Sequence, residues 1–289
     1  MTGSRESCHE PASMIQTACD DASQERVPNF CIGAQRAATT YLYELLAAYT
    51  NAQLSPLKEV HFFDAPTVGT LHAYHSCFPG LINAVDITPG YSVNKERLNR
   101  IFKYNARAKL LLIERNPVDR IVSHYLYYRD RYSDAGSFDS FLSNNRDDCI
   151  GRCAYQAIAS AIASLFGAEH FMRLSYEDLT RHPETSIDAV INFFGLRRVA
   201  VPLVQSSQRV VNSSGRVRSS HLFRTLRSAY RRLPITVPYS LKARLVLGLD
   251  LAYTRLAWLR AAPDPQDAEQ LKCYAAQYLT AVRPEDFWI

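Results

Sequence analysis

The chain is 289 residues long, and this length alone does not decide between one large domain and two small ones. An apolar content of 47% excludes an intrinsically disordered chain. The net charge of +5 suits an anionic ligand, but the basic residues are not dense enough to indicate nucleic-acid binding.

The cysteines and the apolar segments bear on the cellular compartment. Seven cysteines are an odd number without regular spacing, and Cys149 and Cys153 lack the second pair that a zinc site would need, so we interpret all seven as reduced thiols. Residues 1–26 lack the apolar segment of a signal peptide and are predicted to be a flexible N-terminus. Residues 153–168 are too short to span a membrane, and charged residues interrupt the apolar run 241–259. The sequence therefore predicts a cytoplasmic protein without a membrane anchor.

Strand-like apolar runs alternate with helical patterns along the first two thirds of the chain. Strands are predicted at residues 28–32, 82–87, 109–114 and 171–175, and helices at residues 40–48, 118–129, 155–166 and 187–194. This alternation predicts an α/β fold of three layers, with a central parallel sheet flanked by helices. The uninterrupted apolar run 110–113 is typical of a central parallel strand.

The domain organisation follows from the same patterns. Residues 27–289 are predicted to form a single domain, in which residues 65–85 are a loop broken by Pro and Gly. Residues 219–263 are predicted to be a helical region of uncertain role.

The first predicted strand runs into a loop with the composition of an anion-binding site, CIGAQRAATT at residues 31–40. Gly33 breaks the strand, and Thr39 and Thr40 open the next helix, so backbone N–H groups and hydroxyls would face an anion together with the charge of Arg36. The loop lacks the Gly and Lys of a Walker A motif, which argues against a nucleoside triphosphate. An ordinary turn with a surface arginine is the alternative.

The third predicted strand is followed by the sequence ERNPVDRIVSHY at residues 114–125. Asn116 is expected to cap the next helix, with proline at its first position. Because ligands of parallel sheets bind at the carboxyl ends of the strands, Arg115 falls at the same edge as the loop after residue 33. An arginine suits bidentate binding of phosphate, with Ser123 on the second turn of the helix. Spacing alone leaves an ion pair of Arg115 with Asp119 equally open.

A third segment, KEVHFFD at residues 58–64, carries a carboxylate and an imidazole two residues apart. In an extended segment Glu59 and His61 point to the same side. A partly desolvated carboxylate can act as a general base, and the histidine could orient it. The alternatives are a solvated Glu59 paired with Lys58 and a hydrogen-bonded core histidine.

These segments, together with YEDL at residues 176–179 and FFGL at 193–196, resemble in the same order the motifs of sulfotransferases that use 3′-phosphoadenosine 5′-phosphosulfate (PAPS). The KE-x-HFFD segment resembles the branch that includes heparan sulfate sulfotransferases and many bacterial members. The family typically has Lys where Arg36 stands and Gly where Ala38 stands. The resemblance covers roughly residues 27–196, and residues 271–288 resemble the family's C-terminal helix and tail. By the same resemblance, residues 219–263 would be part of the acceptor cleft or a lid. The carboxylates of the YEDL segment are expected to act as helix caps.

The resemblance implies in-line transfer of a sulfuryl group from PAPS to a hydroxyl or amine of a small-molecule or carbohydrate acceptor, leaving 3′,5′-adenosine bisphosphate. It implies that Glu59 is the general base and that Arg36, His61 and Lys58 complete the catalytic group. It implies no metal, no nucleic-acid partner and no membrane partner. The donor-binding residues that it implies are Gly33, Ala34, Gln35, Arg36, Ala37, Ala38, Thr39, Thr40, Arg115, Ser123, Gly215, Arg216 and Arg218.

Two other functions stay open at this point. A nucleotide-dependent kinase of related fold would need Mg²⁺ ligands and a Walker A lysine. A non-catalytic nucleotide-binding relative would have aromatic and basic residues interleaved on an exposed surface, in place of a buried Glu59 beside the loop at residues 31–40. The sequence decides neither the acceptor, nor oxygen against nitrogen as the accepting atom, nor the oligomeric state.

Overall fold

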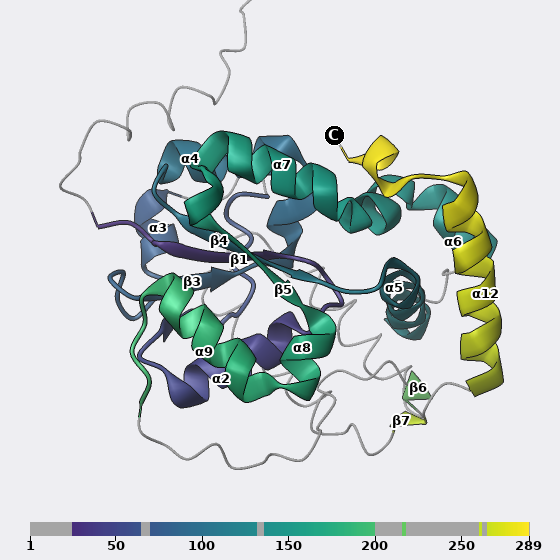
Figure 1. Cartoon of the computed structure of the whole chain (residues 1–289), viewed down its shortest axis with the longest axis horizontal. Coiled ribbons are helices and arrows are strands. Elements are labelled where there is room, and N and C mark those ends of the chain that lie inside the picture. Colours follow the sequence, from purple (N-terminus) through teal and green to yellow (C-terminus); the bar gives the residue numbers. More distant parts are fainter. Residues whose placement is uncertain are drawn as a thin grey trace, which may run out of the picture.

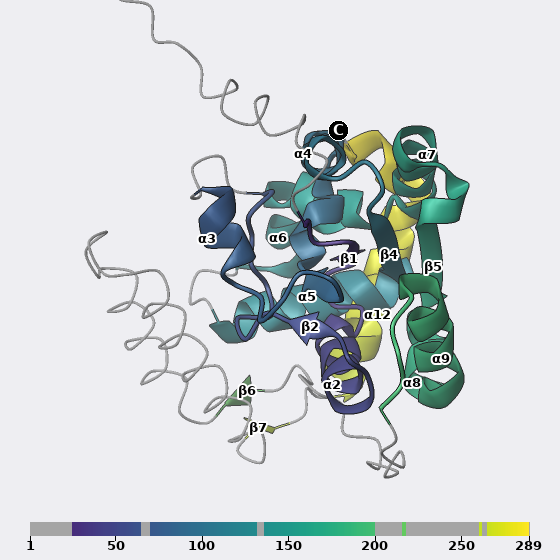
Figure 2. The same cartoon turned by 90° about the vertical axis from the view of Figure 1, so that its left-hand side faces the viewer.

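The computed structural model describes residues 25–64, 70–131, 136–199, 216–217, 260–261 and 265–288. Its centre is a parallel sheet of five strands in the order β2-β3-β1-β4-β5. Strands β1, β3, β4 and β5 are labelled in Figure 1 and strand β2 in Figure 2. The strands are β1 (Asn29–Gly33), β2 (Gln53–Leu54), β3 (Ala84–Ile87), β4 (Lys109–Glu114) and β5 (Phe171–Ser175). All four predicted strands are present, and the two-residue β2 is too short to show in the sequence pattern.

Helices cover both faces of this sheet, which confirms the predicted three-layer α/β fold. One face carries α3 (Leu71–His75), α4 (Lys95–Tyr104) and α7 (Tyr155–Phe166), and the other carries α2 (Thr39–Tyr49), α8 (Tyr176–Arg181) and α9 (Pro183–Phe194) (Figures 1 and 2). Strand β4 shows how the layers are filled. Leu110 and Leu112 pack in the first core and Leu111 and Ile113 in the second, because successive side chains of a strand point to opposite faces.

A third group of helices lies beyond the carboxyl end of β4. It consists of α5 (Pro117–Arg131), α6 (Phe138–Asn144) and the long helix α12 (Pro265–Ala281), which packs along α5 around a core of its own. The side-chain oxygen of Asn116 accepts from the N–H groups of Val118 (2.9 Å) and Asp119 (3.3 Å), so the predicted cap of α5 is confirmed. This cap begins α5 directly after β4 and fixes the helix at the edge of the sheet.

Several local predictions are corrected. Helix α3 lies inside the expected loop 65–85, where Thr70 caps it by accepting from the N–H of Ala73 at 3.3 Å. Helix α4 was missed, although Asn94 caps it in the same way. Helix α8 is capped by the hydroxyl of Ser175 rather than by its own carboxylates.

The remaining elements are short. They are the 3₁₀ helices Pro89–Val93, Gly151–Cys153, Ala168–His170 and Pro284–Phe287, a π-helical turn Arg146–Ile150, and the antiparallel pair β6 (Arg216–Val217) and β7 (Arg260–Ala261). The expected flexible N-terminus lies outside the described residues except for its last two. Most of the region 219–263 also lies outside them, so its role and the single-domain assignment stay predictions.

Candidate active site

The loop after β1 turns sharply from the sheet into α2. A Cβ atom on Gly33 would stand 2.4 Å from the Ser92 hydroxyl oxygen, so the strand end needs glycine for this close approach. Arg36 and Ala38 have φ angles of 69° and 62°, in the left-handed region that few residues other than glycine adopt. The left-handed Ala38 gives a physical reason for the glycine that the family typically carries at this position.

Helix α2 begins at this turn with an anion-attracting end. Its cap residue, Ala38, makes no side-chain hydrogen bond to the first turn, and that turn contains no acidic residue. The N–H groups at the start of a helix lack partners within the helix and carry its positive partial charge. The end of α2 therefore suits a phosphate or sulfate group.

The side chain of Arg36 joins this loop to α5. Its Nε donates to the Ser123 hydroxyl at 3.2 Å, and its guanidinium lies over the Tyr127 ring at 4.7 Å from the centroid. Ser123 and Tyr127 are four residues apart on one helix, so they occupy the same face of α5. Two predicted donor-binding residues from different strand ends, Arg36 and Ser123, therefore meet.

Arg115 extends this cluster from the end of β4. Its Nη1 donates to the carbonyl oxygen of Arg36 at 2.8 Å, and its guanidinium lies 4.4 Å from the centroid of the Tyr176 ring. Its Nε is buried and makes no hydrogen bond to the described part of the chain. Asp119 accepts from Lys272 at 3.1 Å and is not the partner of Arg115, so the alternative ion pair does not form.

The segment 58–64 lies beside the same loop, but its backbone is not extended. Lys58 and His61 have φ angles of 57° and 58°. His61 Nε2 nevertheless lies 3.4 Å from Glu59 Oε2. The expected proximity of Glu59 and His61 is thus present, and it comes from left-handed turns instead of strand alternation.

Charged groups alternate along this segment. Lys58 Nζ lies 2.6 Å from Glu59 Oε1 and 3.5 Å from the Thr39 hydroxyl oxygen. His61 Nδ1 lies 2.7 Å from Asp64 Oδ2. The side chains of Glu59 and His61 are 35% and 49% exposed, so an acceptor can reach both.

This arrangement changes the proton affinity of both groups. Burial would raise the pKa of Glu59, but the Lys58 charge and the hydrogen bonds from His61 and Lys58 outweigh burial and lower that pKa well below its usual value. The hydrogen bond to Asp64, followed by the one to Glu59, raises the pKa of His61 to about 10. At neutral pH Glu59 is therefore an ionised carboxylate between two cations.

Asp64 is a site residue that the sequence analysis did not single out. Besides its hydrogen bond with His61, its Oδ2 lies 3.9 Å from Arg97 Nη1, and a Cβ atom on Gly90 would stand 2.4 Å from the same oxygen. The sequence did indicate a possible contact between the two side chains, because Asp64 follows His61 by three residues in the KEVHFFD segment. An aspartate at that spacing can reach a histidine only across a turn, which the expected extended backbone concealed.

Some of the other predicted donor-binding residues lie in the described part of the chain, and some lie outside it. Ala34 and Ala37 are buried, and Gln35 has a buried Oε1 with no hydrogen-bond partner in the described ranges. The N–H of Ala34 donates to the Ile113 carbonyl at 2.9 Å and ties the loop to β4. Gly215 and Arg218 lie outside the described residues, as does the side chain of Arg216.

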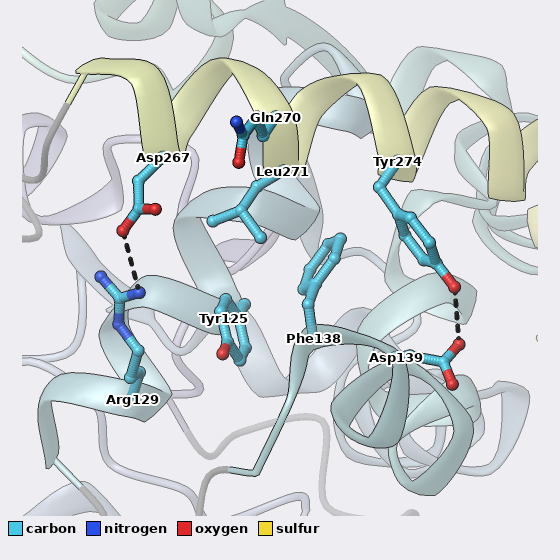
Figure 3. Close-up of a pocket in the computed structure, with 8 residues that line it drawn as sticks. All are labelled: Tyr125, Arg129, Phe138, Asp139, Asp267, Gln270, Leu271 and Tyr274. Atoms are coloured by element: carbon cyan, nitrogen blue, oxygen red, sulfur yellow. Dashed lines mark hydrogen bonds and ion pairs between the residues drawn. The ribbon is translucent and has the colours of Figure 1, made fainter.

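A cavity of about 370 Å³ lies elsewhere, between α5, α6 and α12 (Figure 3). Four of its polar side chains form two pairs, Arg129 with Asp267 at 3.7 Å and Tyr274 with Asp139 at 2.8 Å. None of the predicted site residues that the structure describes lines it. We therefore place the candidate site at the strand ends and not in this cavity.

Comparisons with known proteins agree with the motifs. A family model described as the sulfotransferase domain matches residues 29–226. Human heparan sulfate glucosamine 3-O-sulfotransferase 3A1 is 26% identical over 201 residues, which cover 65% of this chain and 49% of that protein. The human 3B1 enzyme is 27% identical over 200 residues, covering 65% and 51%. The chain thus spans about half the length of the curated relatives it matches.

Among solved structures, a sulfotransferase from Alicyclobacillus acidocaldarius superposes with a TM-score of 0.54 at 22% identity. The superposition covers 59% of this chain and 81% of that one. At this identity the likeness is one of fold.

The predicted cytoplasmic location is corrected by these comparisons. The curated relatives are named for heparan sulfate, a polysaccharide that is sulfated in the Golgi lumen and not in the cytoplasm. The prediction depended on the lack of a visible anchor in the sequence. In the ranges that the structure covers, no helix is long and apolar enough to cross a membrane.

Proposed function

The chain belongs to the sulfotransferase family, as its motifs predicted, and we propose that it transfers a sulfuryl group from PAPS to a hydroxyl group of a carbohydrate. Family membership identifies it as an enzyme of the transferase class. The donor, the acceptor and the residue roles given below are the content of the proposal.

The residues at the strand ends fit the two anionic ends of such a donor. The start of α2 and Arg36 suit the 5′-phosphosulfate, because helix N–H groups and a guanidinium both bind sulfate and phosphate oxygens. Arg115 and Ser123 suit the 3′-phosphate. The Nε of Arg115 supports this assignment, because it is buried and has no hydrogen-bond partner among the described residues. A buried donor in that state costs free energy that a bound phosphate oxygen would recover.

The observation that carries the proposal is the position of Lys58. Its ammonium nitrogen lies 3.5 Å from the Thr39 hydroxyl in the donor loop and 2.6 Å from the Glu59 carboxylate. One side chain therefore connects the proposed donor site to the proposed base. In-line transfer needs the donor and the base within such a distance, because the acceptor must lie between them.

The reaction can then be written in terms of these residues. When bound, PAPS supplies an activated sulfuryl group and a phosphate leaving group. Glu59 accepts the proton of the acceptor hydroxyl. At the same time the oxygen of that hydroxyl bonds to sulfur, and the bond between sulfur and the phosphate oxygen of PAPS breaks. Lys58, Arg36 and the N–H groups of α2 neutralise the charge that develops on the leaving phosphate.

His61 completes this arrangement as an orienting group. Asp64 holds its ring through Nδ1, and the Nε2 side faces Glu59. The resulting imidazolium can direct the carboxylate or an anionic acceptor. No group of three His, Cys, Asp or Glu side chains in the described ranges could hold a metal ion. That the reaction needs no metal stays a prediction.

The carbohydrate acceptor is proposed from the relatives. Their printed names specify 3-O-sulfation of glucosamine in heparan sulfate, which is an anionic sugar polymer. A net charge of +5 is compatible with such an acceptor. The relatives favour a hydroxyl over an amine as the accepting group, and a small-molecule alcohol is the competing acceptor class.

The test is transfer of radiolabelled sulfate from PAPS to heparan sulfate oligosaccharides by the purified chain, with chelator present. We expect labelled oligosaccharide, and loss of labelling in the Glu59→Gln variant. A parallel screen of alcohols and amines tests the acceptor class. If the protein binds neither PAPS nor 3′,5′-adenosine bisphosphate, or if it binds only ATP with Mg²⁺, the proposal is wrong.

A further inference from the structure

A carboxylate lies inside the sheet, away from the loops described so far. Asp86 is fully buried in β3 between the apolar residues Val85 and Ile87. Burying a carboxylate is costly unless other groups donate hydrogen bonds to it. The groups that donate hydrogen bonds to Asp86 therefore have to be identified.

Three hydroxyl groups surround this carboxylate. Oδ2 receives hydrogen bonds from Tyr74 at 3.0 Å and from Tyr91 at 2.9 Å, and Oδ1 receives one from Thr88 at 2.7 Å. Burial raises the pKa of Asp86 to about 6, and the three hydroxyls limit that rise. The carboxylate is therefore mainly ionised at neutral pH and can only accept, so each hydroxyl must use its single hydrogen to donate.

All three hydroxyls are thereby left with acceptor capacity alone, and those of Thr88 and Tyr91 face the segment 58–64. The Thr88 hydroxyl accepts from the N–H of Val60 at 3.1 Å, and the Tyr91 hydroxyl accepts from the N–H of Phe62 at 3.1 Å. Val60 and Phe62 alternate with Glu59 and His61 along the chain. The hydrogen bonds that begin at Asp86 thus hold the backbone on each side of His61.

The segment needs such support because of its conformation. Lys58 and His61 both have positive φ angles, which cost a non-glycine residue free energy unless its surroundings hold it. Val60 and Phe63 anchor the segment in the core, but the side chains of Glu59 and His61 are about one third and one half exposed, so packing does not fix these two residues. The backbone hydrogen bonds to Thr88 and Tyr91 are buried or partly buried and do not compete fully with water.

We propose that Asp86 is a positioning residue for sulfuryl transfer, which acts through Thr88 and Tyr91 to hold Glu59 and His61 in place. This inference rests on the proposed function of the site. Strand β3 would then contribute to catalysis through Asp86, although no side chain of β3 lies among the proposed catalytic groups. The competing explanation is that Asp86 and its hydroxyl partners only stabilise the core.

Tyr74 offers a matched control for this distinction. Tyr74 and Tyr91 are both almost completely buried, and both donate to Asp86 Oδ2 at nearly the same distance. Within the described residues, only Tyr91 also accepts from the N–H of Phe62. Tyr74→Phe and Tyr91→Phe therefore each remove one hydroxyl that donates to Asp86. Only Tyr91→Phe also removes the acceptor for the N–H of Phe62 in the segment 58–64.

The experiment compares these two variants and Thr88→Val with the wild type. Steady-state transfer gives kcat and KM, titration calorimetry gives the affinity for 3′,5′-adenosine bisphosphate, and thermal melting gives stability. We expect Tyr91→Phe and Thr88→Val to lower kcat by ~10- to 100-fold, since small displacements of catalytic groups have effects of this size. Their affinity for the bisphosphate should not change. Tyr74→Phe should lose stability comparably and keep its kcat within about threefold.

A second readout does not need turnover. The ring resonance of His61 is followed by NMR as a function of pH in the same variants. Displacement of the segment breaks the pair with Asp64, so the titration midpoint of His61 should fall in Tyr91→Phe and Thr88→Val and stay unchanged in Tyr74→Phe. If the wild type transfers no sulfate, the proposed function fails while this readout still tests the positioning role.

Two results would overturn the inference. One is an equal loss of kcat, or an equal fall of the His61 midpoint, in Tyr74→Phe and Tyr91→Phe. The other is wild-type kcat and wild-type titration in both Tyr91→Phe and Thr88→Val. Asp86→Asn is a supporting variant, because its amide would donate to one hydroxyl and reverse that bond. Asp86→Asn replaces a buried carboxylate and can prevent folding, so Tyr91→Phe and Thr88→Val are the variants that decide the question.

Discussion

The donor loop (residues 33–40) and the base segment (residues 58–64) lie side by side but are held in different ways. The donor loop is an extension of β1 into α2, tied to the neighbouring strand by the bond from Ala34 N–H to the Ile113 carbonyl at 2.9 Å. The base segment belongs to no helix or strand. The buried side chains of Val60 and Phe63 anchor it in the core. Its polar residues are held by the hydroxyls of Thr88 and Tyr91 and by the pairs of Glu59 and His61.

The two kinds of support match two different tasks in the proposed reaction, donor binding and proton removal. A loop fixed by the sheet offers the same N–H groups and cations before and during the reaction, which suits donor binding. A segment with polar contacts of this kind can hold a carboxylate ionised and close to the acceptor, ready to accept a proton, although the lowered pKa makes Glu59 a weaker base than a free glutamate. Substitutions in the donor loop region should therefore change affinity, and substitutions in the base segment should change turnover.

The largest expected effect is that of Glu59→Gln. The amide keeps the shape of the side chain but cannot take a proton, so kcat should fall by ~100- to 10,000-fold, the range that general bases contribute. The measurement is transfer of labelled sulfate at saturating PAPS, with calorimetry of the bisphosphate as the control for an intact donor site. Turnover at the wild-type rate would remove Glu59 from the mechanism.

Arg115→Ala should have the next largest effect, on affinity. Loss of a charged hydrogen-bond donor to the 3′-phosphate should weaken binding of 3′,5′-adenosine bisphosphate by ~10- to 100-fold, as measured by calorimetry. Arg173→Ala is the matched control, because Arg173 lies on the adjacent strand β5 and pairs with Glu114. Equal losses in the two variants would show that general positive charge, and not Arg115, attracts the ligand.

Asp64→Asn should act on His61. The folded protein raises the pKa of His61 to about 10, so this histidine should stay protonated through neutral pH and lose its proton only as pH rises toward that value. Removing the Asp64 charge lowers the pKa toward its usual value of about 6.5. An NMR titration measures both midpoints, and the other histidine resonances are the internal control. A wild-type midpoint near 6.5 would contradict the proposed pair.

The smallest expected effect is that of Arg36→Lys, which introduces the residue typical of the family. The charge stays, but the bond from Nε to Ser123 at 3.2 Å is lost. Affinity for the bisphosphate should fall only a few-fold, and Arg36→Ala should weaken it further. If Arg36→Lys abolished binding, the fork of the guanidinium would be essential to this loop.

The sequence predicted the donor side better than the base side. Strand β4, the cap at Asn116 and the position of Arg115 at the same sheet edge as the donor loop follow from local signals, since each depends on a strand that ends beside its neighbour. The turns at Lys58 and His61 could not be predicted, because they depend on the hydroxyls of residues almost thirty positions away.

The same reason explains the site residues that were missed. Asp64 reaches His61 only across a turn, and Asp86 is read from the sequence as a charge inside an apolar strand. The charge at Asp86 was itself a signal, since a carboxylate among Val85 and Ile87 needs donors from elsewhere. The sequence does not say which donors these are.

The most direct test of the account is calorimetric titration with 3′,5′-adenosine bisphosphate in the presence of chelator, on the wild type, Glu59→Gln and Arg115→Ala. The account predicts tight, metal-independent binding by the wild type and by Glu59→Gln, and weak binding by Arg115→Ala. Binding of ATP with Mg²⁺ alone, or an equal loss of affinity in both variants, would contradict a donor site and a base segment with separate tasks.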